Sequence, residues 1–115
     1  RLTYGETQML YLNAAQATEV ASRLGSANAR YFLRKYVYLR YSQNPNFEDL
    51  KTIVDYLGET NQRELSDEIV KSVVEWNFKR IKERDPAATN PLAPLEDFAN
   101  LCYFKENTES ILRRN

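Results

Sequence analysis

The segment around residues 46–58 constrains the fold most strongly, because its apolar side chains recur every three or four residues. The positions that share this spacing are Phe47, Leu50, Ile53, Val54 and Leu57. At about 100° per residue they fall on one face of an α-helix, whereas a strand would need alternation. Asn46 is a suitable N-cap, and Gly58 is a suitable stop. The segment therefore predicts an amphipathic helix that needs other apolar faces to pack against.

The same spacing predicts two helices before this segment. The first is expected over residues 4–24, opened by the Ser/Thr-x-x-Glu capping pattern that begins at Thr3 and closed by Gly25. The second is expected over residues 27–43, with Ser26 as its cap and a proline beyond its end. Because so short a connection separates them, the two helices should form an antiparallel hairpin.

Two further regions follow the amphipathic segment. A helix should start at Thr60 or Ser66 and end before Pro86, and its apolar residues cover more than one stripe, which predicts a central position. Residues 85–94 hold three of the four prolines and form the one linker-like stretch. The segment 94–115 after this linker predicts one helix or two short ones. It is either part of the core or only loosely attached to it.

Together these segments predict an all-α fold. We expect a single domain over residues 1–115, built as a compact bundle of four to five helices with an N-terminal antiparallel hairpin and a proline-rich loop before the C-terminal helix. Its stability would come from apolar burial, at ~25 cal/mol per Å². The predicted core residues are Leu10, Ala14, Ala17, Ala21, Leu24, Leu33, Val37, Leu50, Ile53, Val54, Leu57, Ile69, Val73, Trp76 and Phe98.

The composition excludes several common kinds of catalytic, metal-binding and nucleotide-binding site. The chain has no histidine and one cysteine, so it lacks the commonest general base and the ligands of a structural zinc site. Its three glycines lie too far apart for a phosphate-binding loop. Glu64 and Glu68 stand one helical turn apart, as solvated acids often do, and Cys102 has the apolar neighbours of an inert core thiol. The sequence therefore predicts no enzyme, no catalytic residue, no cofactor and no metal.

The cysteine count also bears on the compartment. A single cysteine and the absence of any Asn-x-Ser/Thr acceptor favour an intracellular protein, cytoplasmic or nuclear. No apolar run approaches the ~20 residues of a membrane span, so no membrane partner is expected. The start at Arg1 resembles neither a signal peptide nor an initiation site, which predicts that the chain begins inside a longer protein or follows processing.

The stretch RYFLRKYVYLRY, residues 30–41, is the strongest candidate for a binding site. It carries four basic residues, four tyrosines and no acid. On a helix most of these side chains gather opposite the apolar face, and only Arg40 falls on the apolar side. Tyrosine and arginine often carry the binding energy of protein interfaces. The predicted partner-binding residues are Arg30, Tyr31, Arg34, Lys35, Tyr38 and Tyr41.

Two other interpretations of this strip remain open. The chain has a formal net charge of zero, but residues 20–47 carry five basic residues and no acidic one, whereas residues 48–70 carry seven acidic residues against two basic ones. The strip can therefore be neutralised inside the molecule, by ion pairs worth ~0 to 1 kcal/mol each. Residues 71–85 again carry an excess of positive charge, with five basic residues against three acidic ones.

The third interpretation is nucleic-acid binding. Residues 18–36, TEVASRLGSANARYFLRKY, resemble a helix-turn-helix motif, with a short turn that leads into a basic helix. Tyrosines interleaved with arginines would also suit stacking on single-stranded bases. The acidic residues that follow argue against a long anionic ligand. A protein-interaction module that docks an acidic or phosphorylated partner is therefore the main hypothesis, with nucleic-acid binding as the alternative.

Overall fold

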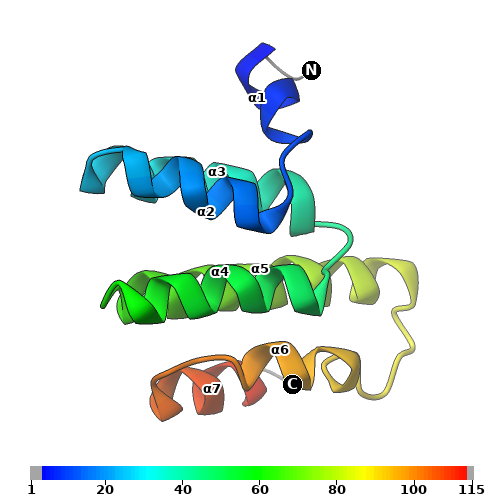
Figure 1. Ribbon diagram of the computed structural model, residues 1–115. Helices are drawn as coiled ribbons and strands as arrows, with labels where there is room; N and C mark the ends of the chain where they lie inside the picture. Colours follow the sequence, from blue (N-terminus) through cyan, green and yellow to red (C-terminus); the bar gives the residue numbers. More distant parts are fainter. Residues whose placement is uncertain (1–3, 114–115) are drawn as a thin grey trace.

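The chain folds into helices and loops in the computed structural model, which describes residues 4–113 (Figure 1). No strand occurs in this range, as the all-α prediction requires. In chain order the helices are α1 (Tyr4–Met9), α2 (Ala14–Arg23), α3 (Ser26–Tyr41), α4 (Phe47–Glu59), α5 (Arg63–Arg84), the 3-10 helix η1 (Ala93–Leu95), α6 (Glu96–Ala99) and α7 (Lys105–Leu112). Between residues 4 and 113 there are thus seven α-helices, whereas the sequence predicts four or five.

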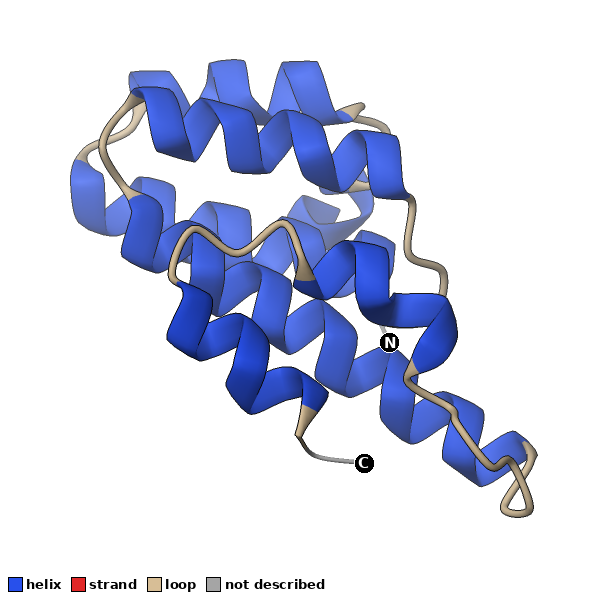
Figure 2. Ribbon diagram, turned by 90° about the horizontal axis from the view of Figure 1, so that it is seen from below, coloured by secondary structure: helices blue, strands red, loops and turns tan. Residues whose placement is uncertain are grey.

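Pairs of helices are stacked in layers (Figure 1). The pair α2 and α3 lies on one side of the pair α4 and α5, and α6 and α7 lie on the other side. Figure 2 shows the C-terminal pair in front of α4 and α5. The long helix α5 contacts α3, α4, α6 and α7, which explains why its apolar residues cover more than one stripe. The short helix α1 contacts α3 and projects from the stack.

The predicted first helix is in fact two helices. Helix α1 ends at Met9, and α2 starts after Asn13, whose side chain accepts a hydrogen bond of 2.8 Å from the Gln16 amide. The Gln16 side chain in turn accepts from the Asn13 amide at 2.9 Å. This reciprocal capping box starts a new helix, so the helix does not continue through it although the apolar spacing does. The predicted cap Thr3 lies outside the described residues.

Glycines do not end the helices in the way that the sequence predicts. Gly25 has an ordinary φ of −65° and is the N-cap of α3, so Ser26 is the first residue of that helix and not its cap. Helix α4 continues through Gly58 to Glu59. Its end is a Schellman motif, in which the Asn61 amide donates to Gly58 at 3.2 Å and the Gln62 amide to Leu57 at 2.7 Å. Asn61, with φ 59°, takes the left-handed position.

The segment after Pro94 packs against the central helices. Asp67 of α5 is 1% exposed, and its carboxylate accepts hydrogen bonds from the amides of Tyr103 at 2.7 Å and Phe104 at 2.9 Å. The side-chain amide of Asn107 donates to the same carboxylate at 3.1 Å. One buried acid thus satisfies free amides at the start of α7, a helix whose own N-cap provides no side-chain acceptor.

The buried core contains most of the predicted residues. Two predictions are wrong: Leu24 is 38% exposed beyond the end of α2, and Leu10 is only partly buried. Trp76 is partly buried and packs against the core. Leu10 lies in the turn that follows α1, because the capping box interrupts the helix there. The core also holds Tyr36 and Tyr41, which are 0% and 1% exposed.

Candidate functional site

The residues of the predicted binding strip all lie on α3, but they do not form one surface. Tyr31 and Tyr38 are 69% and 49% exposed, in agreement with an outward position. Arg34 lies between them on the same side, since residues three, four and seven apart share a helix face. Lys35 turns toward α1, where its ammonium lies 3.6 Å from the Glu6 carboxylate.

The arginines of the strip pair with a carboxylate of the neighbouring helix. Arg30 lies 3.0 Å from one oxygen of Glu68 in α5, and Arg34 contacts the other oxygen of the same carboxylate. All three side chains are 42–55% exposed, so the pairs stabilise the fold by only ~0 to 1 kcal/mol each. Part of the positive charge that was predicted to contact a partner is therefore offset within the molecule.

The prediction that Tyr41 faces outward is wrong. Tyr41 is the last residue of α3 and is 1% exposed, because the end of this helix leans into the core beside α5. Its ring meets Tyr36 edge-on, with 6.1 Å between centroids and an interplanar angle of 83°. Burial away from water raises the pKa of the Tyr41 hydroxyl far above its ordinary value. Tyr41 is thus a core residue and does not belong to a binding face.

Arg40 falls on the apolar side of α3, as the spacing predicts, and the structure gives it local partners there. Its guanidinium donates to the carbonyl of Leu10 at 2.8 Å. It also lies 5.8 Å from the centre of the Tyr36 ring and 4.0 Å from a carboxylate oxygen of Asp49. Arg40 therefore holds the turn between α1 and α2 against α3 and is not available to a partner.

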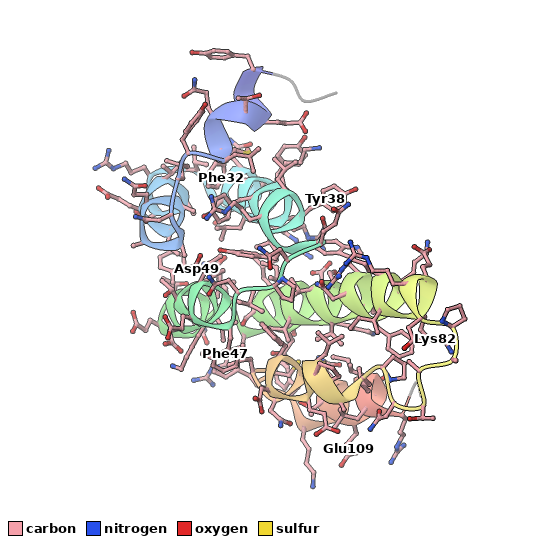
Figure 3. The ribbon with its side chains drawn as sticks, turned by 90° about the vertical axis from the view of Figure 1, so that its right-hand side faces the viewer. Phe32, Tyr38, Phe47, Asp49, Lys82 and Glu109 are labelled. Carbon is pink, nitrogen blue, oxygen red and sulfur yellow. The ribbon has the colours of Figure 1, made fainter. Side chains whose placement is uncertain are left out.

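The aromatic pair Tyr38 and Trp76 lies where α3 and α5 run side by side. Figure 3 shows Tyr38 on α3 next to the C-terminal half of α5. The ring of Tyr38 meets that of Trp76 edge-on, at 5.1 Å between centroids and 83° between planes. Both rings reach the surface, since Tyr38 is exposed and Trp76 is partly buried. Such a pair offers a rigid apolar contact area together with two groups that can form hydrogen bonds.

Two hollows share this pair as a common wall. The first, of about 280 Å³, lies toward the start of the helices and is lined by Arg34, Glu68 and the apolar side chains of Val37 and Ile69. The second, of about 380 Å³, lies toward their ends. We call these the apolar hollow and the basic hollow. The residues that line the basic hollow besides the aromatic pair are Ser42, Gln43, Lys79, Arg80, Glu83 and Arg84.

The basic residues of the C-terminal half of α5 differ from those of α3 in one respect. None of the ion pairs found between residues 4 and 113 uses Lys79, Arg80, Lys82 or Arg84. The sequence-predicted strip does not include them, although the positive excess of residues 71–85 already indicates a basic region there. We call the surface that joins Lys79, Arg80 and Arg84 to the exposed residues of α3 the α3–α5 face. It consists of Tyr31, Arg34, Tyr38, Trp76, Lys79, Arg80 and Arg84.

Asn77 fixes the geometry of this face from below. It is 0% exposed, and its amide group donates to the carbonyl of Tyr41 at 2.9 Å and to that of Val73 at 2.8 Å. The first bond ties the end of α3 to α5. The side-chain oxygen of Asn77 accepts from the Arg80 guanidinium at 3.2 Å. One buried side chain thus sets both the distance between the helices and the direction of an arginine.

Comparisons of the chain with protein-family models, with curated proteins and with solved structures found no match. The function therefore has to be argued from the residues of this chain.

A larger hollow of about 700 Å³ lies at the other end of α3, where it meets the turn between α4 and α5. Two cations line it, Arg30 and Arg63. Arg30 pairs with Glu68, and the guanidinium of Arg63 lies 5.3 Å from the centre of the Tyr103 ring. Because both cations already have partners, this hollow is a weaker candidate than the α3–α5 face.

The resemblance of residues 18–36 to a helix-turn-helix does not extend to its geometry. The two helices of that motif cross at about 90–120°. Helices α2 and α3 instead run side by side (Figure 1). Moreover, Arg30 and Arg34 of α3 both pair with the Glu68 carboxylate of α5, which would lie close to the phosphates of a duplex bound there.

The remaining observations concern the cysteine, possible metal ligands and helix length. Burial, and after it the nearby Asp67 carboxylate, raises the pKa of the Cys102 thiol to about 11, so the thiol is protonated at neutral pH. Over residues 4–113, no group of three or more His, Cys, Asp or Glu residues is arranged to hold a metal ion. None of the described helices is long and apolar enough to cross a bilayer.

Proposed function

We propose that this chain is a non-catalytic protein-interaction module whose α3–α5 face docks an acidic segment of another protein. The observation that supports it best is the pair Tyr38 and Trp76, which stands at the surface between two hollows. Aromatic side chains in such positions give a large contact area for few flexible bonds, which is why they dominate the energetics of many interfaces. The surrounding arginines and lysines would select an acidic partner and orient it.

The proposed site keeps part of the sequence-predicted strip and moves its centre. Tyr31, Arg34 and Tyr38 remain, because they are exposed on one side of α3. Lys35 lies toward α1, and Tyr41 belongs to the core. The positive charge that is free to meet a partner comes from α5.

Capture and titration with surface variants test the proposal. The variant Tyr38→Ala/Arg84→Glu removes an aromatic contact and reverses a charge of the face. The matched control Tyr4→Ala/Lys51→Glu makes the same two changes at exposed positions of α1 and α4. Proteins captured by the full chain are identified by mass spectrometry, purified and titrated by calorimetry.

We expect at least one captured protein to bind directly, and its Kd to rise about tenfold or more for the first variant and to stay unchanged for the control. Circular dichroism checks that both variants are folded. Partners whose affinity is the same for both variants would contradict the proposal.

The nucleic-acid alternative makes a different prediction. Binding of single-stranded DNA by four or five cations should weaken with salt at a log-log slope near −3 to −4. Because Glu68 already neutralises part of the charge on α3, we expect Arg30→Glu/Arg34→Glu to leave retention on a heparin column nearly unchanged. A steep salt slope that this variant abolishes would favour nucleic acid instead.

A further inference from the structure

The basic hollow at the ends of α3 and α5 has features that a general acidic contact does not require. Three cationic side chains line it, from Lys79, Arg80 and Arg84, together with the hydroxyl of Ser42 and the amide of Gln43. Glu83 is the one acid among its lining residues. The hollow thus has a local charge of about +2, although the whole chain is neutral.

Arg80 is the least exposed of the three cations and the one whose direction is fixed by a neighbour. One of its terminal nitrogens donates to Asn77, which fixes the direction of the guanidinium. Its Nε is buried, and the described residues offer it no acceptor. Because Nε is buried, the N–H groups of Arg80 that can donate to a bound anion are the remaining ones on its terminal nitrogens.

We infer that the basic hollow binds the phosphate of a phosphorylated serine or threonine, and that the apolar hollow beside it takes an apolar side chain of the same segment. This inference rests on the proposed protein-interaction function and specifies its ligand. A phosphate monoester carries about −1.5 to −2 charges at pH 7 and three strong acceptor oxygens. Three cations offset by one acid match that charge, and the arginines can donate two hydrogen bonds each to one phosphate.

The neighbouring apolar hollow supports a peptide as the carrier of the phosphate. Val37, Ile69 and the ring of Trp76 form the apolar part of its lining, beside Arg34, Glu68 and Ser72, and its volume of about 280 Å³ has room for one aliphatic side chain. Because Tyr38 and Trp76 belong to both hollows, the two subsites are adjacent. A segment with a phosphorylated residue next to an apolar one would fill both at once.

The charge layout disfavours a polynucleotide in the same place. Glu68 lines the apolar hollow, and Glu83 lines the basic hollow. A chain of successive phosphates would meet both carboxylates, whereas a single phosphate in the basic hollow meets three cations and Glu83 alone. The site therefore fits one localised dianion better than an extended polyanion.

Trp76 is the only tryptophan of the chain and forms a wall of both hollows, so its fluorescence reports directly on the site. The full chain is titrated with a degenerate nonapeptide pool that has phosphothreonine fixed at its centre. The same pool with threonine, a pool with glutamate at that position, and oligo(dT) serve as comparison ligands. We expect the phosphorylated pool to change the fluorescence at an at least tenfold lower concentration than any of the three.

Two variants test the residues. Lys79→Gln/Arg84→Gln removes two exposed cations of the hollow and should raise the Kd for the phosphorylated pool about tenfold or more. Lys82→Gln/Lys51→Gln removes the same charge from exposed positions that do not line the hollow, and it should have no effect. Arg80→Lys keeps the charge but loses the fixed guanidinium, so we expect it to weaken binding while the fold is retained.

The outcomes separate this inference from the proposed function. Equal responses to the phosphorylated and glutamate pools, both lost with Tyr38→Ala, would overturn the phosphate site and leave the acidic docking face standing. Equal responses to the phosphorylated pool and oligo(dT) would overturn the peptide ligand. A response that is the same in Lys79→Gln/Arg84→Gln and in its control would also overturn the inference, since another surface would then bind the phosphate.

Discussion

Asn77 is the residue that links the core to the candidate site, because its side chain serves both at once. Replacement by alanine leaves the buried carbonyl of Tyr41 without its donor and frees the Arg80 guanidinium. We expect Asn77→Ala to lower the free energy of unfolding by about 1–3 kcal/mol, measured by urea denaturation. Asn28→Ala, at an exposed position of α3, should change it by less than about 0.5 kcal/mol. Equal effects of the two changes would show that these bonds do not hold α3 to α5.

Cys102 gives a second prediction at the scale of single residues. Burial raises its pKa from 9.0 to about 11, so folding favours the protonated thiol. This contribution to stability is present below the pKa of the unfolded thiol and is lost as the pH rises through the pKa of the folded one. At pH 8 the folded chain should hold about 100-fold less thiolate than the unfolded one. The thiolate of the folded chain is more basic and hence about tenfold more nucleophilic, which offsets part of this difference in thiolate concentration.

Alkylation measures this difference directly. We expect iodoacetamide to react with the folded chain at least about tenfold more slowly than with the urea-unfolded chain at pH 8, followed by mass spectrometry. Glutathione in the same urea solution controls for effects of urea on the reagent. Equal rates for the two states would mean that the thiol is not held in the protonated form.

Among the elements, helix α4 shows that local sequence can predict a helix but not its contacts with distant segments. Its start could be predicted because Asn46 and the apolar face lie together in the sequence, and the Asn46 side chain does cap the helix by accepting from Asp49 at 3.1 Å. The role of Gly58 could not be predicted from local sequence. A Cβ at this position would overlap the hydroxyl of Tyr103, which belongs to the distant C-terminal segment. Gly58 is therefore needed for close packing and not for ending the helix.

This packing predicts a coupling between Gly58 and Tyr103. In an ordinary helix Gly→Ala stabilises by about 1 kcal/mol. Here Gly58→Ala must displace the Tyr103 ring, which loses its hydrogen bond of 3.2 Å to Val54 and its contact with Arg63. Those losses are worth about 1–2 kcal/mol. We thus expect Gly58→Ala to leave the free energy of unfolding nearly unchanged or lower it, but to raise it by about 1 kcal/mol in the Tyr103→Ala background.

Urea unfolding of the four proteins in this double-mutant cycle gives the coupling energy. Circular dichroism of each variant checks that the helices are retained. If Gly58→Ala raises stability equally in both backgrounds, Tyr103 does not rest on Gly58 in solution.

The break between α1 and α2 shows a signal that the sequence contains but that apolar spacing hides. Asn13 and Gln16 stand at capping-box spacing, yet Leu10 and Ala14 keep the helical period across them. Periodicity alone therefore predicts one continuous helix. The local hydrogen bonds of the box decide the outcome, because they satisfy amides that a continuous helix would have satisfied through its own backbone.

At the scale of the molecule, the helical class follows from local patterns, whereas the distribution of free charge does not. The carboxylate of Glu68 offsets part of the positive charge of Arg30 and Arg34, because α3 packs along α5. No feature of the strip itself indicates that neighbour. The basic residues in the C-terminal half of α5 form no ion pair within residues 4–113, because the packing of the helices places no carboxylate within ion-pair distance of them. The candidate face could be located only after the arrangement of the helices was known.

The layered arrangement also predicts how local stability varies along the chain. Helix α5 is covered by helices on both sides, and its buried residues include Leu65, Val70 and Val74. Helix α1 has no buried residue, and α3 is the one helix against which it packs extensively. Amides that open only with the whole molecule exchange slowest, whereas those in weakly packed segments exchange by local opening.

Hydrogen exchange followed by mass spectrometry should therefore show a gradient. We expect peptides from the middle of α5 to stay protected longest, peptides from α7 to be intermediate because Asp67 ties that helix to α5, and peptides from α1 to exchange first. Asp67→Asn should speed exchange in α7 while α2 and α3 keep their rates, since it breaks a contact of the C-terminal layer only. Equal protection of α1 and α5 would contradict the layered distribution of stability, because a molecule that opens only as a whole would protect every buried amide to the same degree.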